Sequence, residues 1–109
     1  MLRSKLYFSQ ILRMINLIEK HREDGLDDEQ NWDATLMRLQ VIGENIGKIP
    51  MGVRKRYPDI EWDKFKNLRN IISHVYIGVL KEVVKDTIEN KLPRLGIEIK
   101  NIMEKLNEK

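Results

Sequence analysis

The fold class is clearest in residues 80–106, which read LKEVVKDTIENKLPRLGIEIKNIMEKL. Apolar residues recur in this segment at the three- and four-residue intervals that define one face of a helix. That face comprises Leu80, Val83, Val84, Ile88, Leu92, Leu95, Ile99, Ile102 and Leu106. The pattern keeps its phase through Pro93, so we expect a helix kinked at Pro93, or two consecutive helices, with the same face buried.

Two more amphipathic helices are predicted in the first half of the chain. The first covers about residues 4–22, with an apolar stripe of Tyr7, Ile11, Met14, Ile15 and Ile18. The acidic segment 23–31, which contains Gly25, predicts a loop. The second helix begins at an N-cap, either Asn31 or Asp33, and ends at Ile49–Pro50. Its apolar stripe is Trp32, Leu36, Leu39, Gly43 and Ile46.

Two glycines of this second helix, Gly43 and Gly47, are four residues apart and share a face. One interpretation is that another backbone approaches this face closely. The other is that one glycine serves packing while the other ends the helix, and for Gly47 we favour this second interpretation.

The segment between Pro50 and Gly78 predicts a short helical turn over residues 51–57 and then a third main helix. This helix starts at Asp59 or Glu61, near Trp62, and its buried stripe is Leu68, Ile71, Ile72 and Val75. Gly78 is expected to break or bend the chain. Because no segment alternates with period 2, we expect an all-α fold, an antiparallel bundle of about four main helices in one domain over residues 1–109.

Composition excludes several kinds of site. The 109 residues contain no cysteine, so disulfides, thiolate nucleophiles and cysteine-ligated metals are excluded. The two histidines, His21 and His74, are far apart, so we expect no metal site and no cofactor. No apolar run reaches the roughly 20 residues that span a bilayer. The N-terminus also lacks the apolar core of a signal peptide, and we expect a cytoplasmic protein with no membrane association.

Positive charge is concentrated between residues 48 and 70. That segment contains seven basic and three acidic residues, whereas the rest of the chain contains 13 basic and 14 acidic residues. The basic residues are Lys48, Arg54, Lys55, Arg56, Lys64, Lys66 and Arg69. Clustered cations attract the phosphates of nucleic acids, which makes this segment a candidate RNA-binding surface. On charge alone, an ordinary solvated surface is the favoured interpretation, because acids are interleaved.

The polar face of the third main helix carries residues suited to phosphodiester chemistry. On a helical wheel, Arg69, Asn70, Ser73, His74 and Tyr76 project away from the apolar stripe. An imidazole exchanges protons near neutral pH, and a guanidinium binds and stabilises phosphate oxygens. RNA supplies its own nucleophile, the 2′-hydroxyl, so such a site could cleave RNA without a metal ion. From chemistry alone, a helix cap or a surface pair is the commoner role for a histidine near an arginine.

The spacing of Arg69 and His74 bears on where such a site would form. Five residues of helix place the two side chains roughly 140° apart. They converge if Arg69 reaches across, if the helix deforms before Gly78, or if a second copy of the chain supplies the partner. We favour the second copy, because the chain is short and each copy contributes one His74.

The segment Arg69-Asn-Ile-Ile-Ser-His74-Val-Tyr76 resembles the R-x4-H-x-Y motif of the HepT toxins, within the HEPN superfamily. Three further segments resemble that family in order and spacing: Ile42-Gly43-Glu44, Pro58-Asp-Ile-Glu-Trp62 and Leu92-Pro93-Arg-Leu95. The likeness runs from about residue 35 to the C-terminus. The chain departs from the family at Val75, where many relatives have Glu, and at Leu80, near which many have an acid.

This resemblance implies a homodimeric helical bundle with a cleft shared between subunits. It implies a metal-independent endoribonuclease that acts as the toxin of a type VII-like HepT/MNT toxin–antitoxin system. Arg69 and His74 would be the catalytic pair, Asn70 and Ser73 would support them, and the MNT nucleotidyltransferase would neutralise the toxin by adenylylating Tyr76. Two alternatives stay open: a non-catalytic nucleotide- or RNA-binding partner of a nucleotidyltransferase, and a plain helical dimerisation protein.

Overall fold

The computed structural model describes residues 2–74 and 77–107 of the chain. The main helices are α1 (Leu2–Lys20), α2 (Glu29–Lys48), α4 (Trp62–His74), α5 (Ile77–Asp86) and α6 (Leu92–Asn107). Shorter helical segments are η1 (Arg22–Asp24), α3 (Met51–Arg56) and η2 (Thr87–Lys91). No strand occurs among the described residues, which confirms the expected all-α class.

Several predicted positions lie outside what the structure describes. Val75 and Tyr76 lie outside the described residues altogether. Gly78, expected to break or bend the chain, lies inside α5, which begins at Ile77, so the helix is not broken at Gly78 itself. The side chains of Ile71, Ser73, His74 and Leu80 lie outside the described part as well. Their expected burial or exposure therefore stays a prediction.

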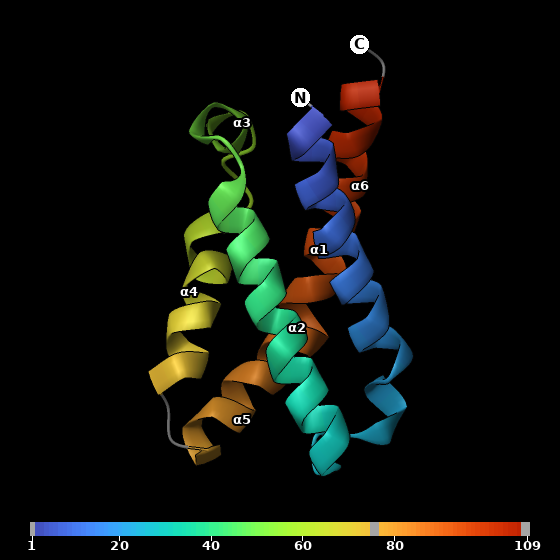
Figure 1. Cartoon of the computed structure of the whole chain (residues 1–109), viewed down its shortest axis with the longest axis vertical. Coiled ribbons are helices and arrows are strands. Elements are labelled where there is room, and N and C mark those ends of the chain that lie inside the picture. Colours follow the sequence, from blue (N-terminus) through green and yellow to red (C-terminus); the bar gives the residue numbers. More distant parts are fainter. Residues whose placement is uncertain (1, 75–76, 108–109) are drawn as a thin grey trace.

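The helices form the expected antiparallel bundle (Figure 1). In Figure 1, α1 descends, α2 returns upward, α4 descends and α6 returns upward. α1 packs against both α2 and α6, and α2 packs against α4. α5 crosses diagonally from the lower end of α4 to the foot of α6. No helix among the described residues is long and apolar enough to cross a membrane.

The loop between α1 and α2 differs in detail from the sequence prediction. α1 ends at Lys20, two residues before the expected end, and Arg22–Asp24 forms one 3₁₀ turn within the expected loop. The N-cap of α2 is Asp28, whose carboxylate accepts a 2.8 Å hydrogen bond from the backbone N–H of Asn31. Asn31 instead donates its side-chain amide to the carbonyl of Gly25, at 2.9 Å. The predicted caps, Asn31 and Asp33, were therefore wrong, because several capping residue types stand close together and the loop path selects one of them.

The buried stripes are shifted slightly from those read in the sequence. In α1, Phe8 is fully buried and Tyr7 only half-buried. In α2, Ile42 is fully buried, whereas Trp32 and Leu36 pack at the edge of the core. The stripes otherwise hold, and the largest fully buried side chains come from α1, α2, α5 and α6, together with Ile49.

The connection from α3 to α4 sets where α4 begins. The expected short turn is confirmed as α3, and Trp62 opens α4 as a buried residue. The Trp62 indole N–H points to two carbonyls at the end of α3, that of Arg54 at 3.1 Å and that of Tyr57 at 3.0 Å. This anchor places the first turn of α4 against the core, followed by Phe65 and Leu68.

The expected kink near Pro93 is confirmed and has a specific form. Proline cannot donate a backbone hydrogen bond, and its ring crowds the carbonyl four residues earlier. The chain accommodates it with a π-helical turn, η2, in which the N–H of Leu92 bonds to the carbonyl of Thr87. The same face stays buried through this turn, as predicted: Val84, Ile88, Leu92, Leu95, Ile99 and Ile102.

Candidate functional site

The candidate site begins with the close approach of α4 to α2 at Gly43. A Cβ at this position would lie 3.1 Å from the carbonyl oxygen of Phe65 and 3.6 Å from the backbone nitrogen of Arg69. The shorter distance is tighter than ordinary van der Waals contact, so glycine permits this approach. The interpretation of Gly43 as the point of close backbone approach is confirmed. Gly47 does not end the helix, because α2 continues to Lys48 and is capped at Ile49.

Arg69 and Glu44 meet across this contact. The Nε atom of Arg69 lies 3.7 Å from Oε1 of Glu44, and both side chains are largely open to solvent. Arg69 and Asn70 are exposed on α4, whereas Trp62, Phe65 and Leu68 of the same helix are buried. The predicted orientation of Arg69 and Asn70 away from the core is therefore confirmed.

The backbone of α4 is α-helical from Arg69 through His74. Over these five residues an α-helix rises about 7.5 Å and turns roughly 140°. The sequence left three ways for Arg69 and His74 to come together, and one of them was deformation of the helix. The helix is not deformed between these two residues. Reach by Arg69 and a second copy of the chain remain as the two routes for the pair.

The predicted basic residues do not gather around the motif. α3, at the upper end of the bundle in Figure 1, carries Lys55 and Arg56, both exposed, while His74 closes the lower end of α4. Lys64 precedes His74 by ten residues, which corresponds to about 15 Å along a helix axis. Lys55, Arg56 and Lys64 therefore lie toward the end of α4 away from His74, whereas Lys66, exposed in the middle of α4, precedes Arg69 by three residues.

Besides Arg69, three of these cations have partners within the fold. Arg54 donates to the carbonyls of Ile49 (3.0 Å) and Gly47 (3.3 Å), where it satisfies the open C-terminal end of α2. Lys64 forms a 2.6 Å ion pair with Glu61. This hydrogen-bonded pair lowers the pKa of the Glu61 carboxyl and raises the pKa of the Lys64 ammonium. Lys48 lies over the ring of Tyr7, with 5.8 Å from its Nζ to the centroid.

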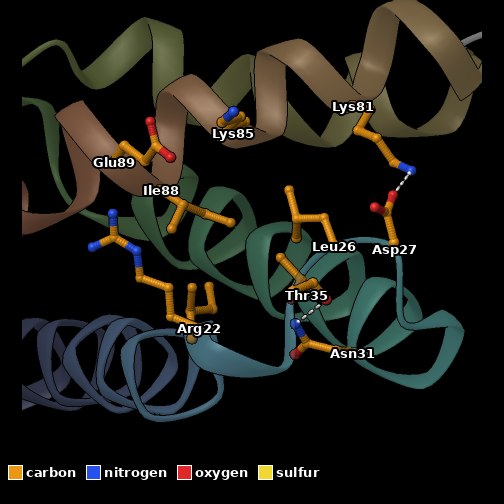
Figure 2. Close-up of a pocket in the computed structure, with 11 residues that line it drawn as sticks. Arg22, Leu26, Asp27, Asn31, Thr35, Lys81, Lys85, Ile88 and Glu89 are labelled. Atoms are coloured by element: carbon orange, nitrogen blue, oxygen red, sulfur yellow. Dashed lines mark hydrogen bonds and ion pairs between the residues drawn. The ribbon is translucent and has the colours of Figure 1, made fainter.

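A cavity of about 340 Å³ lies between the α1–α2 loop and α5 (Figure 2). Its walls combine apolar side chains with two buried polar ones, Asn31 and Thr35. The charged residues at its rim are Arg22, Asp27, Lys81, Lys85 and Glu89. Lys81 and Asp27 neutralise each other at 2.7 Å, and Glu89 follows Lys85 by one helical turn. The rim thus carries three cations and two carboxylates, and neither Arg69 nor Asn70 is among its described lining residues.

The described residues contain no group of three or more histidine, aspartate or glutamate side chains that could hold a metal ion. One residue of the candidate site, Glu44, has no role predicted from the sequence, although it stands in the family-like segment Ile42-Gly43-Glu44. Its signal was the adjacent Gly43, which marks the face of α2 that meets α4.

Known proteins similar to this chain are ribonuclease-like. The family of HepT-like ribonucleases matches residues 9–102, which include the whole Arg69–Tyr76 segment. A protein of Methanocaldococcus jannaschii, named as a gamma-glutamylcyclotransferase and candidate RNase (MJ0434), is 34% identical over 108 residues, covering 94% of this chain and 49% of the relative. This chain therefore spans about half the length of that relative.

Two shorter relatives are also named as candidate RNases. MJ0127 of the same organism is 31% identical over 81 residues, covering 74% of this chain and 67% of the relative. TTE0752 of Caldanaerobacter subterraneus is 28% identical over 83 residues, covering 76% of this chain and 74% of the relative. No solved structure matches the chain significantly. With its helical bundle and the family match over residues 9–102, this chain belongs to the HepT-like ribonuclease family.

Proposed function

We propose that this chain is a metal-independent endoribonuclease and the toxin of a HepT/MNT-type toxin–antitoxin system, acting in the cytoplasm. The single observation that carries the proposal is the family match, which spans the R-x4-H-x-Y segment. The exposed position of Arg69 on α4 supports it, because a phosphate-binding guanidinium must be reachable by RNA.

The proposed reaction is a transesterification within RNA. The 2′-hydroxyl oxygen attacks the adjacent phosphorus and loses its proton to a base. The O2′–P bond forms, the P–O5′ bond breaks, and the leaving 5′-oxygen takes a proton from an acid. His74 would serve in this acid–base work, and Arg69 would stabilise the charge that grows on the phosphate. The products would carry a 2′,3′-cyclic phosphate and a 5′-hydroxyl.

We propose a homodimer with a shared active site. A base and an acid are needed in the same step, and each chain contributes one motif histidine. The backbone of α4 is regular from Arg69 to His74, and five residues of regular helix separate two positions by roughly 140° around the axis. A second copy would supply the complementary group, with Asn70 and Ser73 as supporting polar residues.

The proposed regulator is an MNT-type nucleotidyltransferase that adenylylates the hydroxyl of Tyr76. An adenylyl group so close in sequence to His74 would add bulk and a negative phosphate beside the pair, and so oppose the entry of RNA. Incubation of the protein with ATP and the transferase is expected to add adenylyl mass to the wild type. A Tyr76→Phe variant that gained the same mass would contradict this assignment.

The deciding experiment is RNA cleavage in EDTA by the wild type, Arg69→Ala and His74→Ala. Cleavage by the wild type with cyclic-phosphate ends, reduced to a small residual rate in both variants, supports the proposal. Loss of cleavage in EDTA, or equal cleavage by the variants, would overturn it. An inert wild type that binds a nucleotidyltransferase tightly would instead favour the alternative, a non-catalytic partner subunit.

A further inference from the structure

We propose that Glu44 is a positioning residue that orients the guanidinium of Arg69 toward the RNA phosphate. The inference rests on the proposed function. It assigns a role to a residue that lies outside the R-x4-H-x-Y motif, on a different helix.

α2 contacts Arg69 at two points. The first is its backbone: the nitrogen of Arg69 lies close to the surface of Gly43, so the root of the side chain is held against α2. The second is the guanidinium, whose Nε lies 3.7 Å from the carboxylate of Glu44. Gly43 and Glu44 are adjacent, so one short piece of α2 contacts both the backbone of Arg69 and its Nε atom.

The contact at Nε is compatible with phosphate binding. A guanidinium presents N–H groups along more than one edge, and its terminal edge can grip a phosphate bidentately. A carboxylate on the Nε side thus sets the plane of the group while the terminal edge meets the phosphate. Such preorganisation counts in the transition state, where charge on the phosphate oxygens increases.

The pair contributes little to folding, which separates positioning from a structural role. Both side chains are exposed, at 61% for Arg69 and 43% for Glu44, and exposed ion pairs add little stability. The chain holds a matched control, the pair of Arg22 and Glu19, also 3.7 Å apart and 46% and 42% exposed. Glu19 lies in the last turn of α1 and Arg22 in η1, and neither element carries any of the motif.

The negative charge of Glu44 also has a distinct kinetic signature. A carboxylate repels the RNA backbone, so its removal should not weaken binding, while loss of orientation should slow the chemical step. For Glu44→Gln we expect kcat to fall about threefold to tenfold with KM unchanged or lower. A purely structural residue would instead shift the thermal midpoint.

The test compares Glu44→Gln, Glu19→Gln, Arg69→Ala and the double variant Glu44→Gln/Arg69→Ala in metal-free RNA cleavage. RNA affinity is measured by fluorescence anisotropy with each change placed on His74→Ala, which prevents cleavage. We expect Glu19→Gln to match the wild type, and the double variant to match Arg69→Ala, since Glu44 acts through Arg69. The double variant Glu44→Gln/His74→Ala should bind RNA at least as tightly as His74→Ala.

Three results would overturn the inference alone while leaving the ribonuclease intact. These are an unchanged kcat in Glu44→Gln, an equal loss in Glu19→Gln, or a further fall when Glu44→Gln is added to Arg69→Ala. A wild type that does not cleave RNA in EDTA would overturn the proposed function, and this inference with it.

Discussion

Gly43 of α2 lies against the backbone of Phe65 of α4, so closely that a Cβ on Gly43 would come within 3.1 Å of the Phe65 carbonyl oxygen. This contact sets the distance between the helix that carries the motif and the helix that carries Glu44. Gly43 is also adjacent in sequence to Glu44, which forms the ion pair with Arg69. The packing of the bundle and the geometry of the candidate site therefore depend on one another.

Replacing Gly43 with alanine should therefore destabilise the protein. The neighbouring atoms are backbone, which cannot move aside cheaply, and overpacking of this kind costs about 1–3 kcal/mol of unfolding free energy. Urea denaturation followed by circular dichroism measures the change. Gly52→Ala is the matched control: nothing lies within 4 Å of its Cβ position, so it should be neutral or slightly stabilising. Equal stability of the two variants would contradict the close contact.

Loss of the α2 N-cap should be visible in stability. Asp28→Ala removes the carboxylate that accepts the Asn31 N–H, at a cost of about 1 kcal/mol. Asp33→Ala, at an exposed position within the helix, should leave the thermal midpoint nearly unchanged. The reverse order of the two midpoints would show that the helix begins later than Asp28.

The ion pair of Glu61 and Lys64 predicts a defined pH dependence. Lys64 holds the pKa of the Glu61 carboxyl below its ordinary value of 4.5, so the folded state favours the ionised form. The stabilising effect is present above pH 4.5 and is lost as the pH falls through the lowered pKa. In thermal melts at pH 6, the wild type should have a higher melting midpoint than Glu61→Gln. The difference between the two midpoints should shrink toward pH 3. A gap that widens on acidification would contradict the sign of the shift.

The basic residues should separate into two classes. Lys55 and Arg56 are exposed, so their joint replacement by alanine should lower RNA affinity at low salt and flatten its salt dependence. Arg54→Ala should mainly lower stability, because its guanidinium satisfies two carbonyls at the end of α2. Anisotropy titrations at several salt concentrations and thermal melts of both proteins test this. An Arg54→Ala protein of normal stability and reduced RNA affinity would reverse the assignment.

Much of the fold is readable from local patterns. Apolar spacing identified the amphipathic helices, and Ile49–Pro50 and Pro93 marked a helix end and a kink where the structure has them. The errors were local too: Asp28 caps α2, and Phe8 and Ile42 take core positions that the stripes did not assign. Neighbouring residues of the same type compete for such roles, and the path of the loop or the tilt of the helix decides between them.

For the candidate site, residue types and spacing alone predicted that Arg69 and Asn70 face away from the core, since a helix wheel follows from covalent geometry. The segments at Ile42, Pro58, Arg69 and Leu92 were also enough to indicate the family. Packing between distant segments was needed for the rest. It placed Glu44 against Arg69, committed Arg54 to the end of α2, and put Lys55 and Arg56 at the end of the bundle away from His74. A helical pattern determines which residues share a face, but the partner of that face is chosen by side-chain volume and by contacts such as Gly43 with Phe65, which form only when the bundle assembles.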